Sequence, residues 1–205
     1  MEKYDYSYEG SEGYCYPETD VLINKLGIKD DNALTIAERE ITSIKLLMLY
    51  NRPVNDKLNF DTLCNIHKVI FEDIYEWAGD IRQGDFFSKG NSIFCRGQYI
   101  NENANIIMKN LFKEKYLKEF RKQEFIERMA YYMGEINALH PFREGNGRTS
   151  REFFRQLSLN AMYKLDFSKT EKEELLKADI EAFNGEYQSL IKILDKAIIE
   201  ISNVA

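Results

Sequence analysis

The sequence predicts a nearly all-α single domain with one inserted β-hairpin. Only three prolines occur among 205 residues, and long stretches lack both proline and glycine, which favours helices. Several of these stretches repeat apolar residues at helical spacing. Residues 84–100 differ, because two apolar runs there flank a turn that contains glycine and asparagine.

The expected helices follow one another along most of the chain. Residues 34–50 carry apolar side chains at helical spacing. Residues 60–77 do the same, with Asp61 placed to cap the start of the helix and Gly79 to end it. Further helices are expected at residues 103–119, 122–138, about 146–163, 170–183 and 186–201, the last two separated by Asn184-Gly185.

The predicted hairpin has the sequence GDFFSKGNSIFCRGQYI and is called the flap below. Its tip would consist of Ser88, Lys89, Gly90 and Asn91. A single hairpin is only marginally stable in water. We therefore expect the flap to pack on the helices or to receive a strand from a partner.

The first 16 residues are rich in tyrosine, glycine and glutamate. Such a segment at a chain end is expected to form a flexible arm. Residues 17–205 then make up a single domain, a size that is ordinary for one hydrophobic core.

Composition excludes several classes of protein. The 28 basic and 34 acidic side chains give a net charge of −6, which argues against a nucleic-acid or membrane-surface binder. Cys15, Cys64 and Cys95 form no C-x-x-C pair, so neither a disulfide framework nor a zinc site is expected. The chain shows no signal peptide and no apolar run long enough to span a membrane. We therefore expect a cytoplasmic protein.

The most informative stretch is LHPFREGNGRTSR, residues 139–151. Pro141 ends the preceding helix, and Gly145 and Gly147 allow backbone N–H groups to approach a ligand closely. The next helix begins there, so its unpaired N–H groups and its positive dipole end point into the loop. These features predict an anion site.

The side chains of this loop extend the prediction to a polyphosphate. Arg148 and Arg151 lie three residues apart at the helix start, where two guanidinium groups suit a phosphate chain. Asn146 can donate from its amide, and Glu144 can hold Mg²⁺ together with phosphate oxygens. His140 is the one titratable base at the edge of the site. A plain helix-to-helix turn with solvated arginines is the alternative, but it does not account for the combination.

The segment HPFREGNGRTSR resembles the signature H-P-F-x-[D/E]-G-N-G-R-x-x-R of Fic-domain proteins at every conserved position. Residues 66–82, 88–95 and 16–30 are also similar to that family. The resemblance implies a Fic-type helical bundle, with residues 84–100 as its flap and residues 140–151 as its signature loop. It also implies transfer of AMP from ATP to a Ser, Thr or Tyr hydroxyl of a target protein.

The resemblance further implies a role for each loop residue. His140 would be the general base, Glu144 the Mg²⁺ ligand, and Phe142 the anchor of the loop in the core. The phosphate-binding groups would be Asn146 with the backbone of Gly145 and Gly147 for the α- and β-phosphates, Arg148 for the β-phosphate, and Arg151 for the γ-phosphate. By contrast, His67 lies in an apolar helix and is expected to be structural.

The flap would receive an extended target segment as an added strand, with the tip residues Ser88, Lys89, Gly90 and Asn91 at the docking site. The chain itself offers hydroxyls for the same reaction. Tyr4, Tyr6 or Tyr8 could accept AMP in self-modification.

Many Fic proteins carry an inhibitory helix with the motif [S/T]-x-x-x-E-[G/N], whose glutamate pairs with the second arginine of the signature. Glutamate precedes glycine or asparagine at positions 9, 12, 102 and 144, but no serine or threonine stands four residues earlier. The resemblance then implies restraint by a separate small antitoxin. Action inside the cell of origin and delivery into another cell both stay open.

Two alternatives stay open at this stage. The same loop can serve transfer from another nucleotide or of phosphocholine, although the Arg148–Arg151 pair favours a triphosphate. A catalytically silent binding module is the second alternative, and the presence of His140 and Glu144 argues against it.

Overall fold

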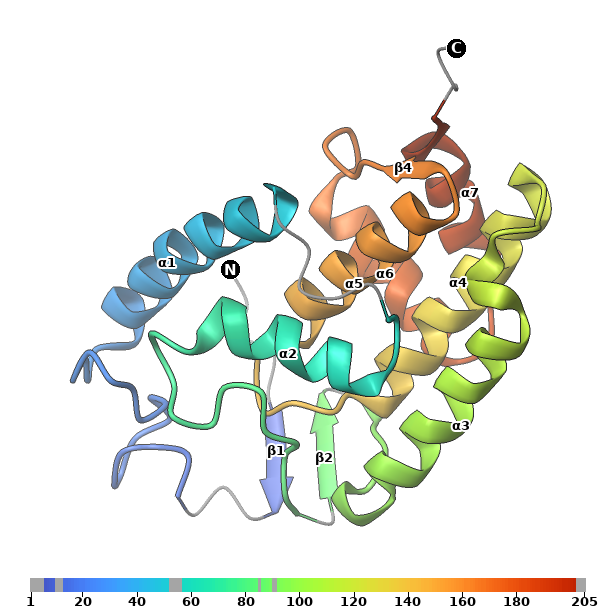
Figure 1. Cartoon of the computed structure of the whole chain (residues 1–205). Helices are drawn as coiled ribbons and strands as arrows, with labels where there is room; N and C mark the ends of the chain where they lie inside the picture. The colour runs from blue at the N-terminus through green and yellow to red at the C-terminus, as the bar shows by residue number, and fades with distance from the viewer. Residues whose placement is uncertain (1–5, 10–12, 52–56, 85, 90–91, 202–205) are drawn as a thin grey trace.

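The computed structural model describes residues 6–9, 13–51, 57–84, 86–89 and 92–201. Helices dominate, as the sequence predicts, and Figure 1 shows them packed against one another, with strands β1 and β2 at one end. The helices are α1 (Asp31–Asn51), α2 (Phe60–Phe71), α3 (Ile100–Lys113), α4 (Lys122–Leu139), α5 (Asn146–Asn160), α6 (Lys172–Phe183) and α7 (Gln188–Ala197), with short 3-10 turns η1 (Gly97–Tyr99) and η2 (Lys115–Leu117). The strands are β1 (Tyr6–Glu9), β2 (Phe86–Lys89), β3 (Ser92–Ile93), β4 (Tyr163–Leu165) and β5 (Ile198–Glu200).

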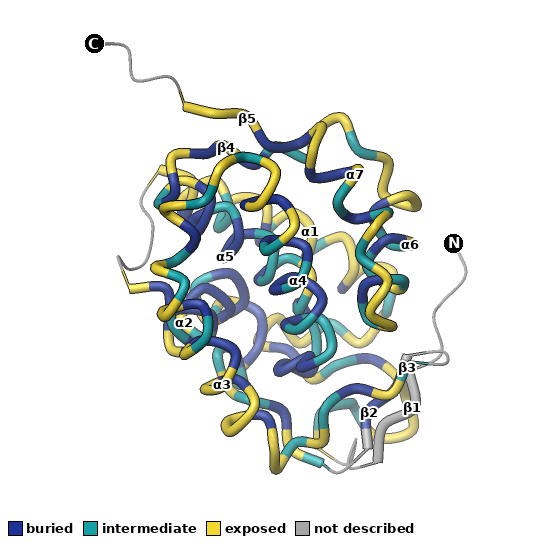
Figure 2. Tube along the Cα trace, turned by 90° about the vertical axis from the view of Figure 1, so that its right-hand side faces the viewer, coloured by how far each residue is buried: buried dark blue, intermediate teal, exposed yellow. Residues whose placement is uncertain are grey.

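Helix α4 forms the centre of the molecule. It packs against α3, α5, α6 and α7, so apolar residues occur on most of its circumference. Phe125, Ile126, Met129 and Ala130 are fully buried, and Figure 2 shows the interior along α4 in dark blue. The C-terminal end of this helix therefore delivers the signature loop from a rigid support.

Helix α2 is shorter than expected. Its start is capped by Asn59, whose side-chain oxygen accepts a hydrogen bond from the Thr62 N–H at 2.9 Å. It ends at Phe71 rather than near residue 77, and turns follow as far as Gly79, which has φ of 91°. Ile74 and Tyr75, in the turns that follow Phe71, are both buried in the core.

The predicted flap is confirmed as an antiparallel pair of strands. In β2 and β3, Ser88 lies opposite Ile93 and Lys89 opposite Ser92. The expected tip residues Gly90 and Asn91 lie outside the described residues. The flap is tied to the bundle, because the Cys95 N–H donates to the Ala138 carbonyl at 3.0 Å.

The first residues differ from the expected flexible arm. Residues 6–9 form strand β1, which pairs antiparallel with β2 and completes a three-stranded sheet in the order β1-β2-β3. The free edge of β2 offers unpaired N–H and C=O groups, and this segment satisfies them. Residues 1–5 and 10–12 lie outside the described part of the chain.

A second departure lies near the C-terminus of the chain. Residue 163 was expected at the end of a helix and residues 198–200 within one, but residues 163–165 and 198–200 form the antiparallel pair β4–β5. Met162 has φ of 64°, which ends the preceding helix, and the isoleucines at 198 and 199 are β-branched residues that favour strands. None of the helices over the described ranges is long and apolar enough to cross a membrane. Cys15, Cys64 and Cys95 are all free thiols.

Candidate active site

His140 lies where α4 ends and the signature loop begins. Its backbone N–H donates to the Ile136 carbonyl at 3.1 Å. Its backbone conformation is left-handed, with φ of 44° and ψ of 63°. A residue other than glycine rarely adopts this conformation unless the surroundings hold it there. The backbone twist turns the histidine away from the helix axis toward the flap.

A buried arginine that the sequence reasoning did not assign holds His140 in place. Arg82 is 1% exposed, and its Nε donates to the His140 carbonyl at 2.7 Å. Its Nη2 donates to the Cys95 carbonyl at the end of the flap. Its own N–H donates to the Pro141 carbonyl at 2.9 Å. Arg82 thus joins the flap to the start of the signature loop, a role that its place in a loop sequence does not reveal.

The flap covers the His140 ring. The ring stacks on Phe94, with centroids 3.8 Å apart, and lies 5.5 Å from the Phe87 ring. His140 is therefore only 9% exposed. Aromatic contacts of this kind hold the imidazole orientation and limit the access of water to one side of the site.

The signature loop closes on itself through Asn146. Its Oδ1 accepts from the Phe142 N–H at 2.9 Å, and its Nδ2 donates to the Phe142 carbonyl at 2.7 Å. Phe142 is 1% exposed, so its expected anchoring in the core is confirmed. The Asn146 amide is engaged within the loop, and its contact with a phosphate stays a prediction.

His67 supports the same loop from α2 and is structural, as expected. Its Nδ1 accepts from the Gly79 N–H at 2.8 Å, so the other nitrogen carries the proton and donates to the Glu144 carbonyl at 3.0 Å. Its ring stacks on Phe142 at 3.9 Å. Burial lowers its pKa to about 4, so it is neutral at neutral pH and cannot serve as a charged ligand.

The start of α5 meets the requirements for an anion site. Gly145 is the N-cap with φ of 82°, no side chain caps the helix, and no acidic residue lies in its first turn. The positive dipole end is therefore not neutralised by the helix itself. A Cβ at Gly145 would lie 2.3 Å from the Phe71 ring, and one at Gly147 would lie 3.1 Å from an Arg151 nitrogen. Glycine at both positions keeps the loop close to its neighbours.

Arg148 is held beside this helix start by α1. Its Nη2 lies 2.6 Å from the Glu38 carboxylate, its Nη1 donates to the Thr42 hydroxyl at 3.3 Å, and its guanidinium lies over the Phe71 ring. Tyr75 donates from its hydroxyl to the other Glu38 oxygen. Sequence reasoning did not find Glu38, because 110 positions separate it from Arg148.

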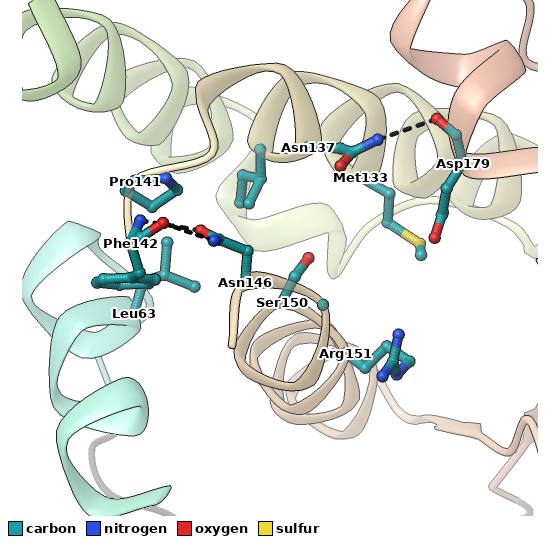
Figure 3. Close-up of a pocket in the computed structure, with 11 residues that line it drawn as sticks. Leu63, Met133, Asn137, Pro141, Phe142, Asn146, Ser150, Arg151 and Asp179 are labelled. Carbon is teal, nitrogen blue, oxygen red and sulfur yellow. Dashed lines mark hydrogen bonds between the residues drawn. The ribbon is translucent and has the colours of Figure 1, made fainter. Parts of the chain in front are cut away.

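Arg151 is less constrained. Over the described ranges it makes no ion pair within 4 Å, and burial lowers its pKa. Arg151 interacts electrostatically with Asp179 of α6, whose pKa is raised to about 6 by burial against the opposing effect of Arg151. Figure 3 shows both side chains on the cavity beside Asn146 and Ser150, which Gly147 also lines. The Arg151 guanidinium thus lines a small cavity at the start of α5.

Glu144 is the one acid of the signature loop. Its Oε1 accepts from the Gly145 N–H at 2.9 Å and lies 3.7 Å from Arg148. No group of three or more His, Cys, Asp or Glu side chains in the described ranges can hold a metal ion. A single carboxylate next to an anion site fits Mg²⁺ that takes most of its ligands from phosphates and water.

The expected target-docking residues lie at the far end of the flap. Ser88 is buried and sits between Ser7 of β1 and Ile93 of β3. Lys89 lies opposite Tyr6 and Ser92, and its side chain is outside the described atoms. Gly90 and Asn91 are not described.

The fold and the site together define a helical protein with an uncapped helix start beside a histidine under a flap. A profile of the Fic/DOC family matches residues 57–158. The chain is 36% identical over 192 residues to the "Probable protein adenylyltransferase Fic" of Escherichia coli K12, covering 94% of each chain. The chain belongs to the Fic/DOC family.

Other comparisons agree with this membership. The "Protein adenylyltransferase VbhT" of Bartonella schoenbuchensis is 40% identical over 95% of this chain, which spans 41% of the length of VbhT. The structure of BepC from Bartonella tribocorum, a VirB-translocated effector protein solved with bound AMPPNP, superposes with a TM-score of 0.85 at 28% identity, covering 92% of this chain and 97% of BepC. The structure of the N-terminal Fic domain of a Bartonella quintana protein, with bound ADP, superposes with a TM-score of 0.86 at 27% identity. The superposition covers 92% of this chain and 95% of that domain's chain.

Proposed function

We propose that this chain is a protein adenylyltransferase that transfers AMP from ATP to a Ser, Thr or Tyr hydroxyl of a target protein. The uncapped start of α5, with Arg148 and Arg151 beside it and His140 at its edge, carries the proposal. Relatives that are named protein adenylyltransferases and a related Fic structure with bound AMPPNP support ATP as the donor.

The reaction follows from the positions of these groups. The backbone at Gly145 and Gly147, with the two arginines, would bind the triphosphate and neutralise its charge. His140 would accept the proton of the target hydroxyl while its oxygen attacks the α-phosphorus. The bond from the α-phosphorus to the bridging oxygen of the β-phosphate breaks, and pyrophosphate leaves. Mg²⁺, when bound through Glu144 and phosphate oxygens, would add positive charge at the leaving group.

The two arginines also distinguish ATP from the alternative donors. A diphosphate-linked donor, such as one that carries phosphocholine, does not need a second arginine for a γ-phosphate. Arg151 lies on the loop cavity without an ion pair within 4 Å in the described part of the chain, which supports a triphosphate. A catalytically silent binding protein has no need for His140 held in a left-handed backbone conformation.

We also propose restraint by a separate protein. A groove between α1, α5 and β4 is lined by arginines and apolar side chains: Leu46, Arg148, Arg151, Glu152, Arg155, Leu165 and Phe167. On α1, Ile44 and Leu47 are each 63% exposed and Met48 is 57% exposed. An apolar helix that carries an acidic residue would fit this surface. Its carboxylate would pair with Arg151, in the way that the glutamate of the inhibitory motif does in other Fic proteins.

A label-transfer experiment distinguishes AMP transfer from the other donors and from a catalytically silent protein. The chain and a cell lysate are incubated with Mg²⁺ and ATP labelled at either the α- or the γ-phosphate. We expect proteins labelled from α-ATP but not from γ-ATP, and no label with His140→Ala. Label from γ-ATP, or equal labelling by His140→Ala, would contradict AMP transfer by this site.

A further inference from the structure

The face of α1 that packs on the rest of the molecule is polar at its centre. The residues at helical spacing along this face are Leu34, Glu38, Thr42, Lys45 and Leu49. The two leucines at its ends are buried, and so is Thr42, whereas the Glu38 and Lys45 side chains are each 15% exposed. A helix that only covered the core would carry apolar side chains at all five positions. Charged groups placed there need partners, and the partners show what the helix holds.

The polar residues of this face divide between two parts of the chain. Lys45 forms ion pairs with Glu72 at 3.2 Å and Asp73 at 2.9 Å, in the segment just after α2. Glu38 and Thr42, one turn earlier, both contact Arg148 at the start of α5 instead. The first contact fastens α1 to its neighbour helix. The second places an acid of α1 directly on an arginine of the signature loop.

Glu38 is held through both of its carboxylate oxygens. Oε1 lies 2.6 Å from Nη2 of Arg148, and Oε2 accepts a hydrogen bond from the Tyr75 hydroxyl. Tyr75 is 1% exposed, and its ring stacks on Trp77 with centroids 4.3 Å apart, so its hydroxyl is a rigid anchor. Burial raises the pKa of Tyr75, so the phenol keeps its proton and stays a donor. Glu38 therefore offers Arg148 an acceptor that is itself fixed.

The Arg148 guanidinium is fixed in turn by three contacts. Nη2 meets Glu38, Nη1 donates to the Thr42 hydroxyl at 3.3 Å, and the group lies over the Phe71 ring at 4.7 Å from its centre. Two hydrogen bonds to one helix and a ring below set the plane of the guanidinium, and its remaining N–H groups can bind a phosphate. An arginine without such support loses much side-chain freedom when it binds an anion, and this loss weakens binding.

We propose that Glu38 is a positioning residue for ATP, which holds Arg148 in the orientation that meets the phosphate chain at the start of α5. This inference rests on the proposed AMP transfer. Glu38 would act through Arg148 and would not touch the phosphates, since two anions repel each other. The carboxylate also offsets part of the positive charge of Arg148, which by itself would weaken phosphate binding. The two effects of Glu38 have opposite signs, so removing the side chain distinguishes them.

The experiment measures ATP binding to the full chain by calorimetry with Mg²⁺, together with the rate of label transfer from α-ATP. Glu38→Ala should raise the Kd for ATP and lower the transfer rate, each by about tenfold, because Arg148 loses its support. Glu38→Gln keeps an oxygen for Arg148 and an amide for the Tyr75 hydroxyl, so both quantities should stay within about threefold of the wild type. Glu40→Gln is the control, because Glu40 is exposed on the same helix, and it should change neither quantity.

A double-mutant cycle tests whether Glu38 acts through Arg148. In an Arg148→Ala background, Glu38→Ala should have no further effect on ATP binding or transfer, since the group that it positions is gone. A further tenfold loss in that background would show a general structural role and overturn the proposal. Tyr75→Phe is a milder variant that keeps the fold, and it should weaken ATP binding in the same direction as Glu38→Ala.

Other outcomes would contradict the proposal as clearly. Tighter ATP binding by both Glu38 variants would show that the carboxylate acts as a counter-charge to Arg148. Equal losses in Glu38→Gln and Glu38→Ala would show that its charge matters and its orientation of Arg148 does not. If the wild type binds ATP but labels no protein, the proposed AMP transfer fails while the binding results still decide the role of Glu38. No ATP binding by the wild type would overturn both proposals.

Discussion

The Nε of Arg82 donates a hydrogen bond to the carbonyl oxygen of His140 at 2.7 Å. These residues are 58 positions apart, and the bond holds the one histidine of the site at the end of α4. The same guanidinium reaches the carbonyl of Cys95, so the flap and the signature loop share one buried support. In the proposed reaction, Arg82 would be a positioning residue that acts through His140.

Replacing Arg82 by methionine should therefore lower both stability and turnover. The change leaves buried carbonyls without donors, which we expect to cost about 2 to 4 kcal/mol of unfolding free energy. Denaturant unfolding would measure this cost. The rate constant for AMP transfer should fall at least tenfold while the KM for ATP stays within about twofold, because the phosphate cradle is untouched. Gln83→Ala, at the exposed neighbouring position, is the control and should change neither quantity.

Gly145→Ala should destabilise the chain more than its backbone conformation alone explains. The positive φ costs an alanine about 1 to 2 kcal/mol, and the new Cβ would also lie 2.3 Å from the Phe71 ring. Gly185→Ala is a matched control, since φ there is 85° and nothing lies within 4 Å of the added Cβ. We expect the unfolding free energy to fall by about 1 kcal/mol or more beyond the control. Equal losses in the two variants would show that the Phe71 contact does not matter.

His67 should make stability depend on pH between about 4 and 6.5. Its pKa in the folded state is about 4, below the ordinary value near 6.5, because it is buried. In this window the unfolded chain binds a proton that the folded chain does not, so the stability that neutral His67 contributes is present above pH 6.5 and lost as pH falls. The full difference corresponds to about 3 kcal/mol. Urea unfolding across pH 4 to 7 should show that the difference in unfolding free energy between wild type and His67→Gln grows with pH by about this amount.

Asp179 should contribute a slope of opposite sign. Its pKa of about 6 lies above the unfolded value near 3.9, so the folded chain binds the extra proton between these values and stability falls as pH rises. Asp179→Asn removes the buried charge and should stabilise the chain at pH 8 by about 2 to 3 kcal/mol, with little effect at pH 4.

The same variant tests the relation between Asp179 and Arg151. Without the opposing carboxylate, Arg151 should bind the γ-phosphate more tightly, lowering the KM for ATP at pH 8 by about threefold to tenfold. Glu181→Gln is the control, because Glu181 lies two residues farther along α6 and does not line the loop cavity. An unchanged KM in Asp179→Asn would show that the two side chains do not influence each other at the site.

Much of the molecule follows from local sequence. The helical periodicity and the Gly–Asn turn between apolar runs predicted the bundle and its hairpin, and both are confirmed. The expected loop between two helices is also present, with α5 beginning at Asn146. These predictions succeed because spacing, capping and turn residues act within a few positions of one another.

Other features could be identified only in the structure, because they depend on pairing between strands that are far apart in the sequence. Residues 6–9 form a strand because β2 has a free edge beside them, and β4 pairs with β5 across more than thirty intervening positions. No local pattern distinguishes such a strand from a mobile arm or the end of a helix.

By itself the sequence determined the identity and order of the groups in the signature loop, since the residues from His140 to Arg151 are adjacent in the chain. Only the tertiary structure decided what holds them: Arg82 on the His140 carbonyl, Glu38 on Arg148, and Asp179 across the cavity from Arg151. The physical reason is that a buried charge or carbonyl must be satisfied by whatever group packing brings within reach. That group can come from any distance along the chain.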